Sequence, residues 1–267
     1  MTLLVIALVS CIITVLLYVI GSIHGFFAAP LIFAVCFGAL FLLCLLPCII
    51  YSLFVDLNKP CTRQSKFFRF YANRLIEIII CTLRIKISVS GTELLPGEKF
   101  LLVGNHRSQM DPIIEMSVFR GYNIGFVSKQ ELFKVPIISK IIHKCFCLPL
   151  DRKSSRNGKT TITQAAEIIM SQNASIGIYP EGTCRAKPEM LPFKTGAFKI
   201  AQKAECPIAV AVIRDSELVS KRAPFRRTTV FVDVVGVIDA KEVLISKTSE
   251  LSGRIRSMME IALKGKI

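Results

Sequence analysis

The chain has 267 residues, of which 52% are hydrophobic, and a formal net charge of +15. This length allows one large domain, or one domain with an anchor. Residues 1–55 contain no Lys, Arg, Asp or Glu, so the whole excess of positive charge lies in the rest of the chain. A basic body beside a charge-free apolar arm favours a membrane partner with anionic lipids. A solvated basic face with no specific partner would also account for the charge taken alone.

Nucleic acid would match the sign of the charge, but the sequence has no zinc finger, no helix-turn-helix and no basic region leading into heptads. We therefore expect no nucleic-acid partner. The ten cysteines are scattered without a C-x-x-C pair, and there are only three histidines. That pattern predicts neither a disulfide framework nor a zinc site, but small buried thiols in a reducing compartment. We expect no metal and no bound cofactor.

Two apolar runs, residues 3–20 and 26–55, flank the turn-like segment 21–25. A bilayer core needs about 20 helical residues to cross, so residues 1–57 are predicted to form a membrane-anchoring helical hairpin. Pro30 and Pro47 leave a re-entrant segment as an alternative to two crossings. Basic residues follow the second run, which favours the cytoplasmic face of the membrane for the body: Lys59, Arg63, Lys66, Arg69 and Arg74.

Residues 58–83 form the next predicted unit, with a helix over 62–82 that carries a narrow polar stripe. Thr62, Lys66, Arg69, Asn73 and Glu77 recur on this stripe at spacings of three and four. The wide apolar remainder fits a helix lying in the headgroup boundary. It fits a helix packed on the body equally well, and both interpretations stay open.

Residues 84–267 alternate between strand-like and helix-like segments. Strands are expected over 84–90, 100–103, 123–128, 175–179, 208–213 and 228–238, and helices over 112–120, 130–144, 159–172, 195–204 and 247–264. Residues 151–159 are expected to form an exposed basic loop. The alternation predicts an α/β domain with a largely parallel or mixed sheet flanked by helices, preceded by the apolar hairpin. Ligands of such sheets gather beyond the carboxyl ends of the strands.

His106 and Asp111 form the first candidate for chemistry. His106 follows the apolar strand 101–103, and Asp111 precedes Pro112 at a position that suits a helix N-cap. With a loop between the two residues, the carboxylate can turn back to the imidazole. A carboxylate on one ring nitrogen fixes the tautomer and stabilises the imidazolium that forms. A capping Asp beside a partly buried His is the alternative when the pair is taken alone.

Four blocks of sequence, in order over residues 99–215, resemble the signatures of the glycerolipid acyltransferases, which include the 1-acylglycerol-3-phosphate acyltransferases. The first is Asn-His-x4-Asp, residues 105–111. The second is 127–136 (VSKQELFKVP) with 148–152 (LPLDR). The third is 179–185 (YPEGTCR) with 191–197 (LPFKTGA), and the fourth is 206–213 (CPIAVAVI).

This resemblance implies that His106 takes the proton of an acceptor hydroxyl, which attacks an acyl thioester, while Asp111 orients His106. It implies an acyl-CoA or acyl-carrier protein donor and a lysophosphatidate acceptor. Another lysophospholipid, glycerol 3-phosphate or a lyso-aminolipid is the alternative acceptor. A catalytically idle, membrane-anchored lipid-binding protein is the non-enzyme alternative. The same resemblance implies that the acceptor and its phosphate are bound by Asn105, Lys129, Arg152, Glu181, Gly182, Thr183 and Arg185.

The sequence departs from the family pattern in the third block. Family members usually carry Arg directly after Glu-Gly-Thr, and here Cys184 stands in that place with Arg185 next. Neighbouring side chains point in different directions, so this departure bears on the phosphate role of Arg185 and on the choice of acceptor.

Overall fold

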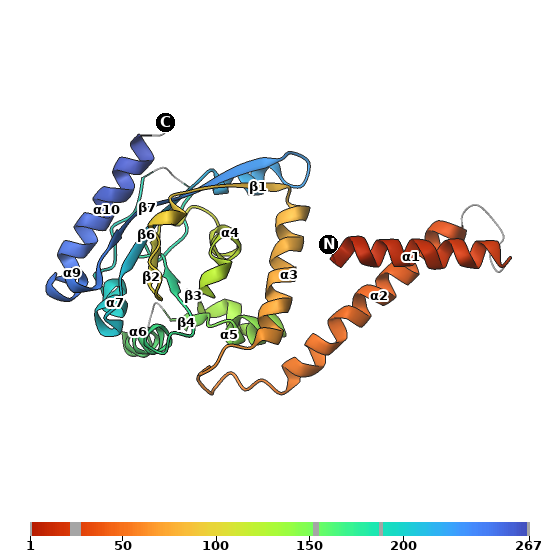
Figure 1. Cartoon of the computed structure of the whole chain (residues 1–267), viewed down its shortest axis with the longest axis horizontal. Coiled ribbons are helices and arrows are strands. Elements are labelled where there is room, and N and C mark those ends of the chain that lie inside the picture. Colours follow the sequence, from red (N-terminus) through yellow and green to blue (C-terminus); the bar gives the residue numbers. More distant parts are fainter. Residues whose placement is uncertain (1, 22–27, 152–154, 187–188, 266–267) are drawn as a thin grey trace. The chain divides into compact units, whose positions relative to one another are not determined.

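The computed structural model describes residues 2–21, 28–151, 155–186 and 189–265, and the chain divides into two compact units, Met1–Asp56 and Leu57–Ile267. The first unit is a pair of packed helices, α1 (Thr2–Val19) and α2 (Ala28–Leu53) (Figure 1). This confirms the predicted helix pair, and α2 is long and apolar enough to cross a membrane. Most of the predicted turn, residues 22–25, lies outside the described residues.

Two hydroxyl side chains of α1 are satisfied within the helix itself. Ser10 donates to the carbonyl of Ile6 at 2.7 Å, and Thr14 donates to the carbonyl of Ser10 at 2.8 Å. Such bonds to the preceding turn leave neither of these two hydroxyls in need of water, as an apolar environment requires.

The second unit is built on a seven-stranded sheet with the order β1-β7-β6-β2-β5-β3-β4. The strands β6, β2, β5, β3 and β4 run parallel to one another, while β7 pairs antiparallel with β6 and parallel with β1. This mixed, mostly parallel sheet confirms the predicted fold class. The strands are β1 (Ile85–Ser90), β2 (Leu101–Gly104), β3 (Gly125–Lys129), β4 (Leu148–Leu150), β5 (Ile176–Ile178), β6 (Ile208–Arg214) and β7 (Thr228–Ile238).

Helices lie on the two sides of this sheet (Figure 1). On one side α6, α7 and α10 bury the main apolar core against the central strands. On the other side α3 packs against α4 and α5. The helices of this unit are α3 (Lys66–Thr82), α4 (Asp111–Val118), α5 (Ile138–Lys144), α6 (Ser155–Met170), α7 (Lys199–Ala204), α8 (Val219–Arg222), α9 (Ala240–Ile245) and α10 (Thr248–Lys264).

Helix α3 begins after Ser65, whose hydroxyl accepts from the backbone N–H of Phe68. It packs on the body through Phe68, Ala72 and Ile76, while Phe70 on another face is 56% exposed. The predicted polar stripe is wrong at Arg69, which is buried. Its guanidinium donates to three backbone carbonyls, those of Asn123, Ile124 and Cys145, at 2.9 to 3.1 Å. A buried cation is tolerated when hydrogen bonds replace its hydration, so Arg69 pins α3 to the body.

Several predicted boundaries are corrected by the structure. The expected helix over 130–144 is divided at Pro136 into a 3₁₀ helix, Gln130–Lys134, and α5. The expected loop over 151–159 is helical from Ser155 onward, where α6 begins. The strand β4 was missed because it has three residues and contains Pro149, which is tolerated here since β4 is an edge strand. All ten cysteines are free thiols.

Candidate active site

The candidate residues converge because the central strands are parallel. His106 follows the end of β2, Tyr179 follows β5, and Lys129 ends β3. These strands lie in the order β2-β5-β3, so their carboxyl ends share one edge of the sheet, where α/β proteins bind ligands. The first three sequence blocks therefore meet in space.

His106 and Asp111 form a direct pair. The Nδ1 atom of His106 lies 2.9 Å from Oδ2 of Asp111, and Asp111 is fully buried. Because a carboxylate only accepts hydrogen bonds, Nδ1 carries the proton, and the lone pair of Nε2 is left for a substrate. The predicted N-cap role of Asp111 is wrong, since Asp111 is the first residue of α4 and its side chain makes no cap bond. Its Oδ2 atom instead accepts from the backbone N–H groups of Arg107 and Ser108 at 2.7 and 2.8 Å.

Two residues predicted to bind substrate hold the His106 loop in place. The side-chain amide of Asn105 donates to the carbonyl of Ile213 and accepts from its N–H, at 3.0 and 2.8 Å. The carboxylate of Glu181 accepts from the N–H of His106 at 3.0 Å and from the N–H of Leu191 at 2.8 Å. Asn105 thus ties the loop to β6, and Glu181 ties it to the third block.

Gly182 turns the chain in the third block, beside the His106–Asp111 pair. It has a φ of +71°, which favours glycine. A Cβ atom there would lie 3.0 Å from Nζ and Cε of Lys194. The bare backbone therefore lets the Lys194 ammonium lie against this turn. Lys194 lies in the third block, but it was not predicted to bind substrate. Its place in the same block as Glu-Gly-Thr could have indicated such a role.

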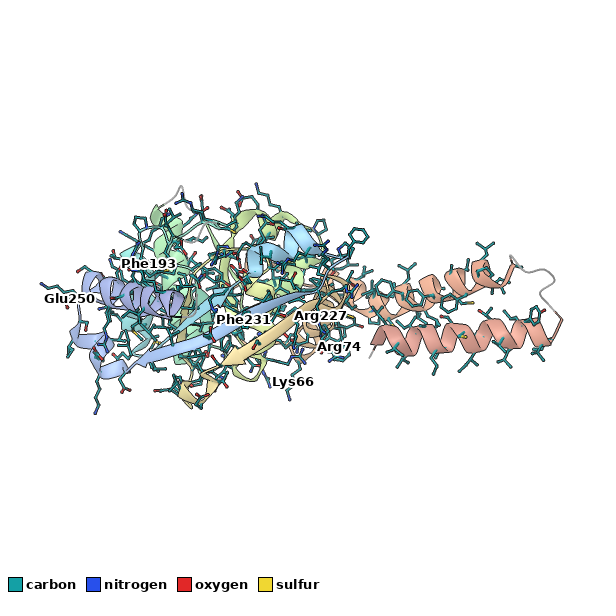
Figure 2. All side chains as sticks on the ribbon, turned by 90° about the horizontal axis from the view of Figure 1, so that it is seen from above. Lys66, Arg74, Phe193, Arg227, Phe231 and Glu250 are labelled. Atoms are coloured by element: carbon teal, nitrogen blue, oxygen red, sulfur yellow. The ribbon has the colours of Figure 1, made fainter. Side chains whose placement is uncertain are left out.

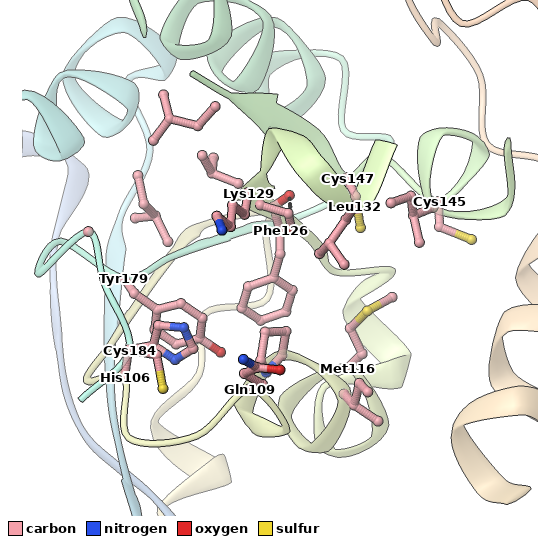
Figure 3. A pocket seen from close by; sticks show the side chains of 18 of the residues that line it. His106, Gln109, Met116, Phe126, Lys129, Leu132, Cys145, Cys147, Tyr179 and Cys184 are labelled. Carbon is pink, nitrogen blue, oxygen red and sulfur yellow. Dashed lines mark hydrogen bonds between the residues drawn. The ribbon is translucent and has the colours of Figure 1, made fainter. Parts of the chain in front are cut away.

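A stacked aromatic ring supports the imidazole from behind. Tyr179 stacks on His106 with ring centroids 4.2 Å apart and planes 8° apart, as the neighbouring rings in Figure 3 show. The Tyr179 hydroxyl donates to Oε2 of Glu115 at 2.6 Å. Both groups are buried, and burial raises the pKa of Glu115 to about 8. Sequence reasoning missed Glu115, because a Glu in a short helix gives no sign of being fully buried.

A cavity of about 930 Å³ opens beside the pair, near the upper end of the usual range of about 300–1,000 Å³ for ligand pockets. His106, Gly182, Cys184 and Lys194 line one part of it, together with Tyr179. The rest is mostly apolar and is built by side chains of α3, α4, α5 and β3. Figure 3 shows Met116 of α4 and Phe126 of β3 among them. Such a shape suits an elongated apolar ligand with a polar end.

The other predicted phosphate ligands divide into three groups. Lys129 and Thr183 line the cavity, and the Lys129 side chain is 59% exposed and pairs with Glu131 at 3.4 Å. Arg185 is not among the described residues that line the cavity; its N–H donates to the carbonyl of His106 at 3.0 Å. Arg152 lies outside the described residues.

Comparison with known proteins finds similarity to acyltransferases. The profile of the Acyltransferase family matches residues 86–214. The 1-acyl-sn-glycerol-3-phosphate acyltransferase of Saccharomyces cerevisiae is 28% identical over 68% of this chain and 61% of its own length. The 1-acyl-sn-glycerol-3-phosphate acyltransferase alpha of Homo sapiens is 28% identical over 48% of this chain. The match covers 46% of that human protein, so the chain spans less than two thirds of these relatives.

A solved structure shares the fold. The crystal structure of the 1-acyl-sn-glycerophosphate acyltransferase of Thermotoga maritima superposes with a TM-score of 0.62 at 21% identity. The superposition covers 82% of this chain and 86% of that one. The α/β unit that carries these matches is therefore similar to the Acyltransferase family over residues 86–214.

Proposed function

We propose that this acyltransferase moves a fatty acyl group from acyl-CoA or acyl-carrier protein to the free hydroxyl of lysophosphatidate, giving phosphatidate. The observation that carries the proposal is the His106–Asp111 pair at the side of a large, mostly apolar cavity. Relatives named as 1-acyl-sn-glycerol-3-phosphate acyltransferases support the choice of acceptor. We assign the catalytic roles to His106 and Asp111.

In the proposed reaction, Nε2 of His106 takes the proton from the acceptor hydroxyl as its oxygen attacks the thioester carbon. The new ester C–O bond forms and the C–S bond breaks. The leaving thiolate takes the proton from the imidazolium and departs as a thiol. Asp111 keeps Nδ1 protonated and stabilises the imidazolium. The stacked Tyr179 ring holds the imidazole plane, so that only Nε2 faces the cavity. General base catalysis of this kind supplies about 100- to 10,000-fold.

The polar end of the cavity supports an anionic acceptor. Lys194 and Lys129 both line it, and the Gly182 turn lets the Lys194 ammonium lie close to the backbone beside His106. A phosphate monoester near two ammonium groups gains charge-assisted hydrogen bonds. The apolar part of the cavity suits the acyl chain, because burying each CH₂ contributes about 0.8 kcal/mol.

The apolar helix α2 supports attachment of the enzyme to a membrane. We place the α/β unit at the cytoplasmic face, since five basic residues lie among the first twenty after the apolar arm. External protease should leave the α/β unit intact in sealed vesicles of cytoplasmic-side-in orientation and should cut it after permeabilisation. Cutting before permeabilisation would reverse the assigned face.

The acceptor is tested with the purified full-length enzyme and a mass-resolved panel. Acyl-CoA and acyl-carrier protein are each offered with lysophosphatidate, lysophosphatidylcholine, glycerol 3-phosphate and a lyso-aminolipid. We expect phosphatidate as the dominant product with at least one donor. Faster transfer to lysophosphatidylcholine would assign another lysophospholipid and leave the mechanism intact. Binding of lysolipid without transfer to any acceptor would support the lipid-binding alternative.

A further inference from the structure

A strongly basic segment lies far from His106 in sequence and has no role in the proposed reaction. Residues 221–227 have the sequence KRAPFRR and connect α8 to β7. We call this segment the basic tip. Phe225 is 86% exposed, and its four basic neighbours are exposed as well. A single exposed apolar residue is common on a protein surface, so it is the combination of an exposed aromatic ring with four exposed cations that points to a contact.

The sequence around the basic tip is free of acidic residues. There is no Asp or Glu from residue 218 to residue 232. Within the part of the chain that the structure describes, no carboxylate forms an ion pair with the tip, whose basic residues are Lys221, Arg222, Arg226 and Arg227. The positive charge of the tip is therefore available to a partner.

The backbone of the basic tip is fixed by hydrogen bonds. The N–H of Arg226 donates to the carbonyl of Arg222 at 2.8 Å, and the guanidinium of Arg84 donates to the carbonyl of Phe225 at 3.3 Å. Arg84 adds a fifth exposed cation, since β1 pairs with β7 in a register that places residue 84 beside the tip. These hydrogen bonds hold the exposed Phe225 ring in a defined position among the five cations.

The topology places the basic tip on the same edge of the sheet as His106. Because β7 runs antiparallel to β6, the first residues of β7 lie beside the carboxyl end of β6. The carboxyl end of β6 in turn lies on the edge at which β2 ends, since β2 and β6 are parallel. In Figure 2, Arg227 lies just before β7 and Phe231 lies within it, while Glu250 of α10 lies toward the other end of the unit.

We propose that the basic tip docks on an anionic lipid surface, with Phe225 in the headgroup boundary and the surrounding cations on the lipid phosphates. Aromatic side chains favour this boundary, and each Lys or Arg near such a surface strengthens association by about fivefold. A lipid surface is favoured over nucleic acid because the same chain carries a helix apolar enough for a membrane. If the proposed function also holds, docking turns the His106 edge toward the lipid that supplies the acceptor.

The sequence contains no Trp, so a single introduced tryptophan reports on its own position. We would compare Phe225→Trp with Ile245→Trp, both in the full-length chain in vesicles that contain anionic phosphatidylglycerol. Ile245 is a matched control because it is also 86% exposed. It follows the far end of β7, an 11-residue strand that spans about 36 Å.

Brominated lipid should quench the fluorescence of Phe225→Trp at least twofold more than that of Ile245→Trp, and only the emission of Phe225→Trp should shift to the blue. The difference should vanish in zwitterionic vesicles, in roughly 1 M salt where the screening length is about 3 Å, and in Phe225→Trp combined with Arg226→Gln and Arg227→Gln. Equal quenching of the two variants, or binding of the tip to RNA with no lipid quenching, would overturn the proposal. Because this readout needs no turnover, an inactive enzyme would count against the proposed function alone.

Discussion

Replacement of Glu115 by Gln is expected to change the pH dependence of stability. Burial raises the pKa of Glu115 from its ordinary value of 4.5 to about 8. Between these values the folded protein holds a proton that the unfolded chain has released. The contribution of Glu115 to stability is therefore fully present below pH 4.5, falls as the pH rises, and is lost above about pH 8. At pH 7 the loss is on the order of 3 kcal/mol, since each pKa unit corresponds to 1.36 kcal/mol.

Gln keeps an oxygen that accepts from the Tyr179 hydroxyl and cannot ionise. We expect Glu115→Gln to raise the free energy of unfolding at pH 7 by up to about 3 kcal/mol and to flatten its pH dependence between pH 5 and pH 8. Thermal unfolding of the full-length protein in detergent micelles would measure this across that range. Glu98→Gln is the control, because Glu98 is exposed. If the free energy of unfolding changed with pH in the same way for the parent and for Glu115→Gln, the claim that Glu115 is a buried, protonated carboxyl would be refuted.

Three further substitutions test other parts of the structure. Asp111→Asn should lower turnover by about 100- to 10,000-fold with little change in KM, because it removes the negative charge that stabilises the imidazolium; steady-state kinetics measure this, and a change in KM alone would contradict it. Arg69→Met should lower the free energy of unfolding by about 3 kcal/mol, since three buried carbonyls lose their donor; a melting midpoint equal to that of the parent would disprove the anchoring of α3. Lys194→Met should raise the KM for lysophosphatidate by about 10- to 100-fold, and Lys199→Met, changed at a more distant exposed residue, should leave the KM unchanged. An equal effect of the two Lys substitutions would remove Lys194 from the acceptor site.

The fold class could be predicted because the alternation of strands and helices is a local pattern. Period-two strands such as 228–238 and amphipathic helices such as 247–264 carry their own periodicity. The strand β4 could not be predicted in this way, because its three residues include Pro149 and its stability comes from pairing with β3. The burial of Arg69 was hidden for a similar reason, since its partners lie 54 to 76 residues away in sequence.

The sequence identified His106 and Asp111 as a candidate pair, but it did not reveal which residues hold this pair in place. Asn105 and Glu181 stand inside recognisable blocks, so sequence reasoning placed them on the substrate. Their side chains instead bond to backbone groups that only the folded topology brings near. Glu115 meets the Tyr179 hydroxyl across 64 residues of sequence, a long-range contact that no local pattern encodes.

The central claim is that His106 performs the acyl transfer. The most direct measurement is the rate of phosphatidate formation from acyl-CoA and lysophosphatidate by full-length enzyme carrying His106→Ala, with the parent in parallel. We predict a loss of at least about 100-fold with an unchanged melting midpoint, because the imidazole is the only group assigned to take the acceptor proton. A variant that folds like the parent and keeps more than about a tenth of its rate would contradict the account.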